Sequence, residues 1–150
     1  MSQIVLLAED EPLISSFVSL SLERAGFVVF LACNAEKALQ VFRNETIDLL
    51  LTDVQMGDGM NGVELAERIR DEQPGTKVLV MSGFPEKEVL TKERTFPFLR
   101  KPFTPAILTE AVRDVLESQP PTQRETKTRL DEANGRSIQK NTSRASSRTG

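Results

Sequence analysis

The stretch IDLLLT at residues 47–52 decides the fold, because it is apolar on both faces of an extended chain and is followed at once by Asp53. A strand with apolar side chains on both faces is buried on both, as in a parallel sheet covered by helices. Similar short runs predict four further strands, at 4–8 (IVLLA), 28–31 (VVFL), 77–81 (KVLVM) and 96–99 (FPFL).

Helix signals separate these runs. Asn34 is a favoured N-cap residue for a second helix. Asn61, with Glu64 three positions later, predicts a capping box and a helix that runs through Arg70. A weaker helical pattern covers 86–90. Every predicted strand is therefore followed by a predicted helix, as in folds that alternate strand and helix.

The first and last helices carry proline at their first positions, where a missing N–H does no harm. Pro12 begins the first helix and Gly26 ends it, while Thr104 caps the last one. Right-handed crossovers then give an α/β fold, a doubly wound five-stranded parallel sheet with helices on both faces. One face is predicted to comprise Leu13, Ile14, Phe17, Val18, Ser21, Leu22 and Ala25 in the first helix, and Ile107, Leu108, Ala111, Val112 and Val115 in the last.

The amino-acid composition of the chain excludes several kinds of functional site. The chain of 150 residues contains no histidine and one cysteine, which excludes imidazole metal sites, histidine-based catalysis and an internal disulfide. No stretch approaches the about 20 apolar residues that a membrane helix needs. The N-terminus lacks the basic and apolar regions of a signal peptide, so we expect the protein in the cytoplasm.

The net charge of −3 conceals two different regions. Residues 1–118 contain 12 Lys and Arg against 19 Asp and Glu, whereas residues 119–150 contain 7 against 3. The second region is rich in Ser, Thr and Arg and poor in large apolar residues, so we predict a disordered basic tail at 119–150 after a folded domain at 1–118.

Polar residues follow four of the five strands. Glu9 and Asp10 come after the first, Asp53 after the third, Ser82 after the fourth and Lys101 after the fifth. Ligands of open parallel sheets bind at the carboxyl ends of the strands, so these side chains are predicted to meet. Crowded carboxylates suit Mg²⁺, and a carboxylate beside that ion can attack a phosphoryl group. A lysine and a hydroxyl would hold the transferred oxygens.

At these residues the sequence resembles the receiver domain of two-component response regulators, over about residues 3–118. The stretch DVQMGDGMNGVELAERIR at 53–70 is similar to receiver domains attached to hybrid histidine kinases. The resemblance implies a flavodoxin-like sheet of strand order 2-1-3-4-5. Its motifs are AEDEP at 8–12, LLLTDVQM at 49–56, VLVMSG at 78–83 and LRKPF at 99–103.

The resemblance also implies roles for individual residues. Asp53 would accept the phosphoryl group from a sensor histidine kinase or a histidine phosphotransfer protein. Glu9, Asp10 and Asp53 would bind Mg²⁺ together with the backbone carbonyl of Gln55. Ser82 and Lys101 would contact the phosphoryl oxygens. The domain would therefore be a phosphoacceptor that assists its own phosphorylation and dephosphorylation, and not an enzyme acting on other substrates.

Two further roles follow from the same resemblance. Phe98 occupies the position of the switch aromatic, which with Ser82 would report phosphorylation to the last helices. The bond before Pro102 is expected to be cis. Where this sequence departs from the family, Glu9 replaces an aspartate, Gly57 a proline and Gly83 an alanine. Asp58, beyond Gly57, reads as a solvated turn residue.

We therefore expect a single-domain response regulator that switches protein–protein interactions, with an unknown downstream target. A phosphorelay intermediate and a phosphate sink are alternatives. A Mg²⁺-dependent small-molecule phosphatase would share the aspartate nucleophile, but it needs a second acid or base and a substrate cap. DNA binding is disfavoured because the folded region is acidic.

Overall fold

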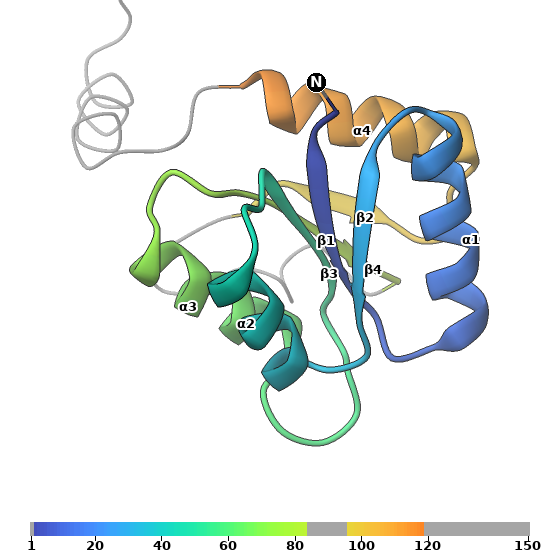
Figure 1. Cartoon of the computed structure of the whole chain (residues 1–150). Coiled ribbons are helices and arrows are strands. Elements are labelled where there is room, and N and C mark those ends of the chain that lie inside the picture. Colours follow the sequence, from blue (N-terminus) through green and yellow to red (C-terminus); the bar gives the residue numbers. More distant parts are fainter. Residues whose placement is uncertain (1, 84–95, 119–150) are drawn as a thin grey trace, which may run out of the picture. The chain divides into compact units, whose positions relative to one another are not determined.

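The computed structural model describes residues 2–83 and 96–118. Five parallel strands form one sheet in the order β2-β1-β3-β4-β5, which confirms the predicted topology (Figure 1). The strands are β1 (Ile4–Ala8), β2 (Val28–Ala32), β3 (Leu49–Asp53), β4 (Lys77–Ser82) and β5 (Phe98–Arg100).

The strand register aligns the carboxyl ends of the strands along one edge of the sheet. Ala8 is level with both Ala32 and Thr52, and Asp53 is level with Met81. Hydrogen bonds continue one residue beyond the strands, since the Glu9 N–H donates to the Ala32 carbonyl at 3.0 Å. The residues that follow each strand therefore lie along this same edge.

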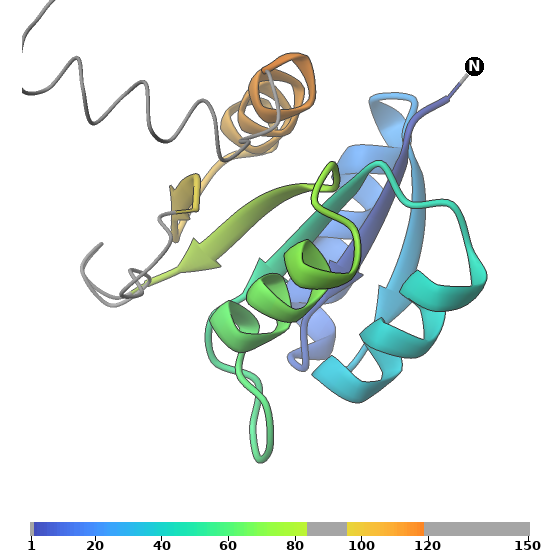
Figure 2. The same ribbon diagram turned by 90° about the vertical axis from the view of Figure 1, so that its left-hand side faces the viewer.

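Helices cover both faces of the sheet, as Figures 1 and 2 show. Helices α1 and α4 enclose one apolar core with the sheet, and α2 and α3 enclose the other. Within the part of the chain that the structure describes, no helix combines the length and apolar character that crossing a bilayer requires. The helices are α1 (Pro12–Arg24), α2 (Ala35–Asn44), α3 (Gly62–Glu72) and α4 (Pro105–Glu117).

The predicted helix starts are confirmed by their caps. The Asn34 side chain accepts a hydrogen bond from the Lys37 N–H at 2.8 Å. Asn61 and Glu64 form the reciprocal capping box, with hydrogen bonds of 2.8 and 2.9 Å. Thr104 caps α4 in the same manner. The helix predicted at 86–90 and the tail predicted at 119–150 lie outside the described residues.

Three residues predicted on the inner faces of the helices are exposed instead. Leu13 is 81%, Phe17 40% and Ile107 50% exposed. Leu13 and Ile107 lie in the first turns of α1 and α4, and Phe17 lies in the second turn of α1, next to Val18, which is buried together with Leu22. A helical pattern marks a broad stripe, and only the part that faces the sheet is buried.

The fifth strand also begins later than predicted. It starts at Phe98, and the preceding Pro97 accepts a hydrogen bond from the Val80 N–H at 2.9 Å. Proline has no N–H to donate, so it limits the pairing that can be made at this point. Phe96, just before, is buried in the core with α2 and α3.

Candidate functional site

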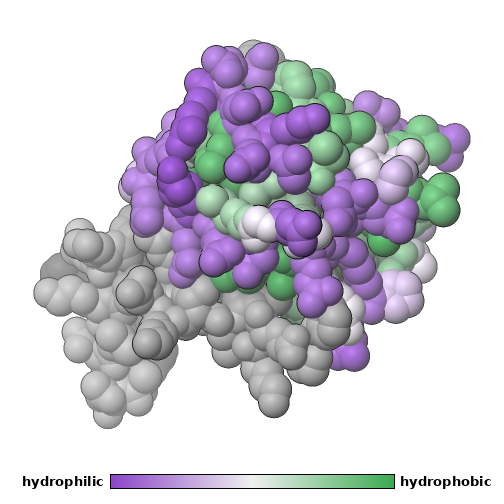
Figure 3. Space-filling model, turned by 90° about the horizontal axis from the view of Figure 1, so that it is seen from below, coloured by the Kyte–Doolittle hydropathy of each residue, from purple (hydrophilic) through white to green (hydrophobic). Residues whose placement is uncertain are grey.

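Three carboxylates meet at the carboxyl edge of the sheet. Glu9 and Asp10 directly follow β1, and Asp53 is the last residue of β3. One ligand oxygen of each lies within 4.8 Å of the other two. Asp10 is exposed, whereas the side chains of Glu9 and Asp53 are only 1% and 13% exposed. Figure 3 views the molecule from this end, where much of the visible surface is hydrophilic.

Lys101 brings a positive charge into this acid cluster of Glu9, Asp10 and Asp53. Its Nζ lies 3.3 Å from Glu9 Oε1 and 3.3 Å from Asp53 Oδ1. The backbone of Lys101 is held beside the end of β4, because its N–H donates to the Ser82 carbonyl at 2.9 Å. The bond from Lys101 to Pro102 is cis. One ammonium group thus bridges carboxylates from two strands.

The environment of Glu9 disfavours its ionised form. Burial raises the pKa of its carboxyl above the usual value, and the negative charge of Asp53 raises it further. The charge of Lys101 opposes these effects, as does the Glu11 N–H, which donates to Glu9 Oε2 at 3.2 Å. Two negative groups held this close repel each other, so a bound cation would stabilise both.

The other predicted site residues differ in how far they are exposed to solvent. Ser82 ends β4 and is buried, on the strand next to Asp53. Phe98 begins β5, is partly buried and packs against the core with α2 and α3. Gln55 lies in the loop after β3 with an exposed side chain, and Asp58 in the same loop is exposed as well.

Gly62 is a residue of the site that the sequence analysis did not single out. A Cβ at this position would lie 1.8 Å from the Asp53 carbonyl oxygen and 2.9 Å from Thr52 Oγ1. The Gly62 N–H donates to the Val54 carbonyl at 2.8 Å, so the start of α3 packs directly on the end of β3. A glycine immediately after the capping Asn61 was the signal available in the sequence.

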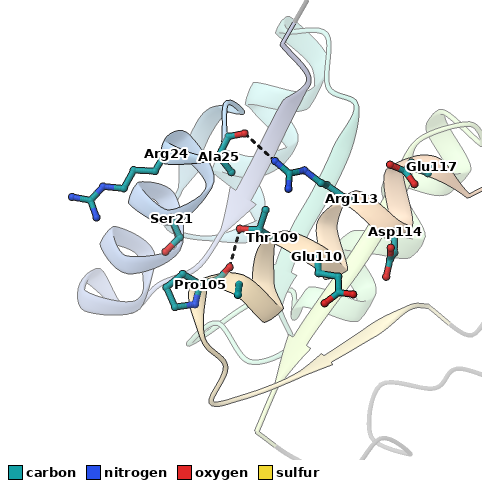
Figure 4. A pocket seen from close by; sticks show the side chains of 10 residues that line it. Ser21, Arg24, Ala25, Pro105, Thr109, Glu110, Arg113, Asp114 and Glu117 are labelled. Atoms are coloured by element: carbon teal, nitrogen blue, oxygen red, sulfur yellow. Dashed lines mark hydrogen bonds between the residues drawn. The ribbon is translucent and has the colours of Figure 1, made fainter.

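An open groove lies away from the acid cluster. It has a volume of about 560 Å³ and lies on the outer surface of α1 and α4, and none of the cluster residues lines it (Figure 4). Arg113 reaches across it and donates to the Ala25 carbonyl at 3.2 Å. The predicted chemistry therefore belongs to the sheet edge and not to this groove.

Fold and site together define a class of protein. The chain is a doubly wound α/β domain whose sheet edge holds three carboxylates and a lysine, an oxygen-rich donor set that suits a hard divalent cation. The chain belongs to the response regulator receiver domain family, because the model of that family matches residues 5–113. It is thus a receiver domain of the kind that acts in phosphorelay signal transduction.

Individual relatives agree with this assignment. The chain is 32% identical to the transcriptional regulatory protein GlrR of Escherichia coli K12 over 78% of its length, and this match spans 27% of GlrR. It is 38% identical to the response regulator receiver protein CpdR of Brucella abortus, over 53% of this chain and 66% of CpdR. The chain therefore spans only about a quarter of the length of GlrR.

Solved structures show the same fold over nearly their whole length. Chemotaxis protein CheY4 of Vibrio cholerae has a TM-score of 0.71 at 26% identity, covering 77% of this chain and 99% of CheY4. Response regulator TrrA of Thermotoga maritima has a TM-score of 0.69 at 25% identity, covering 75% of this chain and 98% of TrrA. These relatives give no support to the small-molecule phosphatase considered from the sequence.

Proposed function

We propose that Asp53 accepts a phosphoryl group from a phosphohistidine on a sensor histidine kinase or a histidine phosphotransfer protein. The P–N bond of the donor breaks while a P–O bond forms to a carboxylate oxygen of Asp53, and the imidazole leaves with the electron pair. The observation that carries this proposal is the position of Asp53, within 4.8 Å of two further carboxylates and 3.3 Å from the Lys101 ammonium.

Mg²⁺ fits the donor set of this site. Glu9, Asp10 and Asp53 would hold it together with the backbone carbonyl of Gln55, all of them oxygen ligands. Bound there, the ion would supply positive charge to the phosphoryl oxygens during transfer. The similar protein TrrA has been solved in complex with Mg²⁺–BeF, which supports Mg²⁺ as the ion that this chain would bind.

The neighbouring residues supply charge, hydrogen bonding and a response. Lys101 would neutralise a phosphoryl oxygen from its place beside Asp53. Ser82, buried at the end of the adjacent strand, would hydrogen-bond another. Phe98 is partly buried and would shift inward with Ser82, gaining packing alone because it has no hydroxyl. Phosphorylation would thereby shift a pre-existing conformational equilibrium.

The output of this switch would be a change in protein–protein interactions. A phosphorelay intermediate that passes the group to a histidine phosphotransfer protein is the alternative, as is a phosphate sink. Mixing the phosphorylated protein with candidate relay proteins separates these, since the label moves only in a relay. The domain would act in the cytoplasm, where it assists its own phosphorylation and dephosphorylation and catalyses no other reaction.

The phosphoacceptor is tested with a small phosphodonor. Acetyl phosphate and Mg²⁺ should add one phosphoryl group to the full chain, detected by intact mass spectrometry. Asp53→Asn should abolish the added mass, because an amide is not a nucleophile toward phosphorus at neutral pH. Asp58→Asn, in the same loop and exposed, is the matched control and should be labelled normally. Labelling that persists in Asp53→Asn would overturn the assignment.

A further inference from the structure

Gly57, in the loop between β3 and α3, has a left-handed backbone with a φ of +57°. Residues other than Gly, Asn and Asp rarely adopt this conformation. Proline cannot adopt it, because its ring fixes φ at about −65°. Since Gly57 replaces the proline expected from the family resemblance, this left-handed turn is a feature of the present chain.

The turn brings position 57 against Asp10, although the two residues are 47 positions apart in the sequence. A Cβ at position 57 would lie 3.5 Å from Asp10 Oδ2, which is van der Waals contact. Asp10 is the exposed member of the acid cluster, whose ligand oxygens lie within 4.8 Å of one another. Any side chain at position 57 would therefore begin beside the carboxylate of the cluster that faces solvent.

The loop is anchored just before this turn. Met56, which precedes Gly57, is 2% exposed and packs in the core with α2 and α3. The Val54 N–H donates to the Met81 carbonyl at 3.0 Å, which ties the first residue of the loop to β4. Gln55, whose carbonyl is a proposed Mg²⁺ ligand, lies between these two anchors. The backbone therefore has little freedom to move position 57 outward and make room for a side chain.

We propose that Gly57 is a positioning residue of the acid cluster, because its lack of a side chain in this left-handed turn keeps Asp10 accessible to a hydrated divalent cation. This inference rests on the proposed function. Mg²⁺ retains several of its water molecules when it binds to a protein. A side chain at position 57 would crowd Asp10 Oδ2 and the water molecules of an ion bound there.

Substitutions at position 57 should therefore weaken Mg²⁺ binding. Gly57→Asn should weaken it about tenfold, the lower end of the range for residues that orient metal ligands. Asparagine tolerates the left-handed conformation, so the turn can persist while the side chain crowds Asp10. Gly59→Asn is the matched control, since Gly59 has a φ of +90° and nothing within 4 Å of its Cβ. This variant should keep the wild-type affinity.

The affinities can be measured by titrating Mg²⁺ into the full chain labelled with ¹⁵N and following backbone amides by NMR. The same spectra report folding through their dispersion. If Gly57→Asn fails to fold, Gly57→Ala compared with Gly59→Ala tests the same contact with a smaller side chain. Equal Mg²⁺ affinities of the variants at positions 57 and 59 would overturn the inference.

A second readout uses no metal. In ¹³C-labelled protein in EDTA, Gly57→Asn should shift the resonance of the Asp10 carboxyl carbon, whereas Gly59→Asn should leave it in place. An unmoved Asp10 resonance in Gly57→Asn would overturn the positioning role. Wild-type protein that shows no Mg²⁺-dependent shifts at the sheet edge would overturn the proposed metal site, while the metal-free spectra would still decide whether position 57 adjoins Asp10.

Discussion

At the scale of single residues, Glu9 is a buried carboxyl group whose surroundings disfavour its ionised form. Its side chain is 1% exposed and shares one ammonium group with Asp53. Burial and the charge of Asp53 raise its pKa above the usual value of 4.5. A carboxyl group with a raised pKa binds its proton more tightly in the folded state than in the unfolded state.

The pH dependence of stability follows from that difference. The contribution of Glu9 is fully present below about pH 4.5 and is lost as the pH rises through the raised pKa of the folded state. Glutamine does not titrate, so the wild type should lose stability relative to Glu9→Gln as the pH increases from 4.5. Urea unfolding in EDTA, followed by far-ultraviolet circular dichroism between pH 4 and 8, measures this difference.

The matched control for losing one carboxylate is Glu110→Gln, at an exposed position on α4. A wild type that gained stability relative to Glu9→Gln with rising pH would contradict the assignment of a raised pKa to Glu9. The sequence predicted that Glu9 and Lys101 would meet at the sheet edge. It could not predict the hydrogen bond between them, because that bond depends on the conformations of two long side chains.

At the scale of elements, the packing of α3 against β3 places Asp53. The first residue of α3 is Gly62, whose N–H donates to the Val54 carbonyl just beyond β3. The Asp53 carbonyl occupies the space that any side chain at position 62 would need. Thr52 Oγ1 donates to the same carbonyl at 2.9 Å, which fixes the peptide next to the proposed phosphoacceptor.

Gly62→Ala should therefore destabilise the fold by about 3 kcal/mol, at the upper end of the usual range for overpacking. The added Cβ would lie 1.8 Å from a backbone oxygen, which cannot move without displacing β3 or α3. Gly75→Ala is the matched control, since nothing lies within 4 Å of its Cβ, and it should change stability by less than about 0.5 kcal/mol. Chemical unfolding measures both; equal effects would contradict the close approach.

The helices show which features could be predicted from the sequence and which could not. The caps at Asn34, Asn61 and Thr104 were predictable because each depends on residues three positions apart. The exposure of Phe17 and Ile107 was not predictable, since the helical pattern marks a broad stripe of which only the part facing the sheet is buried. Phe17 instead lies near Phe103, with ring centroids 6.2 Å apart.

At the scale of the whole molecule, the parallel register converts separate sequence motifs into one site. Ala8 is level with Thr52, so the next residues, Glu9 and Asp53, meet although they are 44 positions apart in the sequence. This part of the site was predictable, because the rule that ligands bind at the carboxyl edge needs only the order and direction of the strands. The proposed Mg²⁺ would relieve the repulsion within this cluster of acids, and its binding would then be linked to the stability of the fold.

Mg²⁺ should therefore raise the midpoint of thermal unfolding. An ion that binds the folded chain alone stabilises it by mass action, and about 1 kcal/mol raises the unfolding midpoint of a domain of about 118 residues by roughly 4 °C. Asp10→Asn removes one proposed ligand at an exposed position and should abolish most of this rise. Circular dichroism at 222 nm, recorded in Mg²⁺ and in EDTA, measures both proteins. The Asp10→Asn protein lacks one acid of the cluster. If Mg²⁺ raised its unfolding midpoint as much as that of the wild type, the ion would be acting elsewhere on the surface.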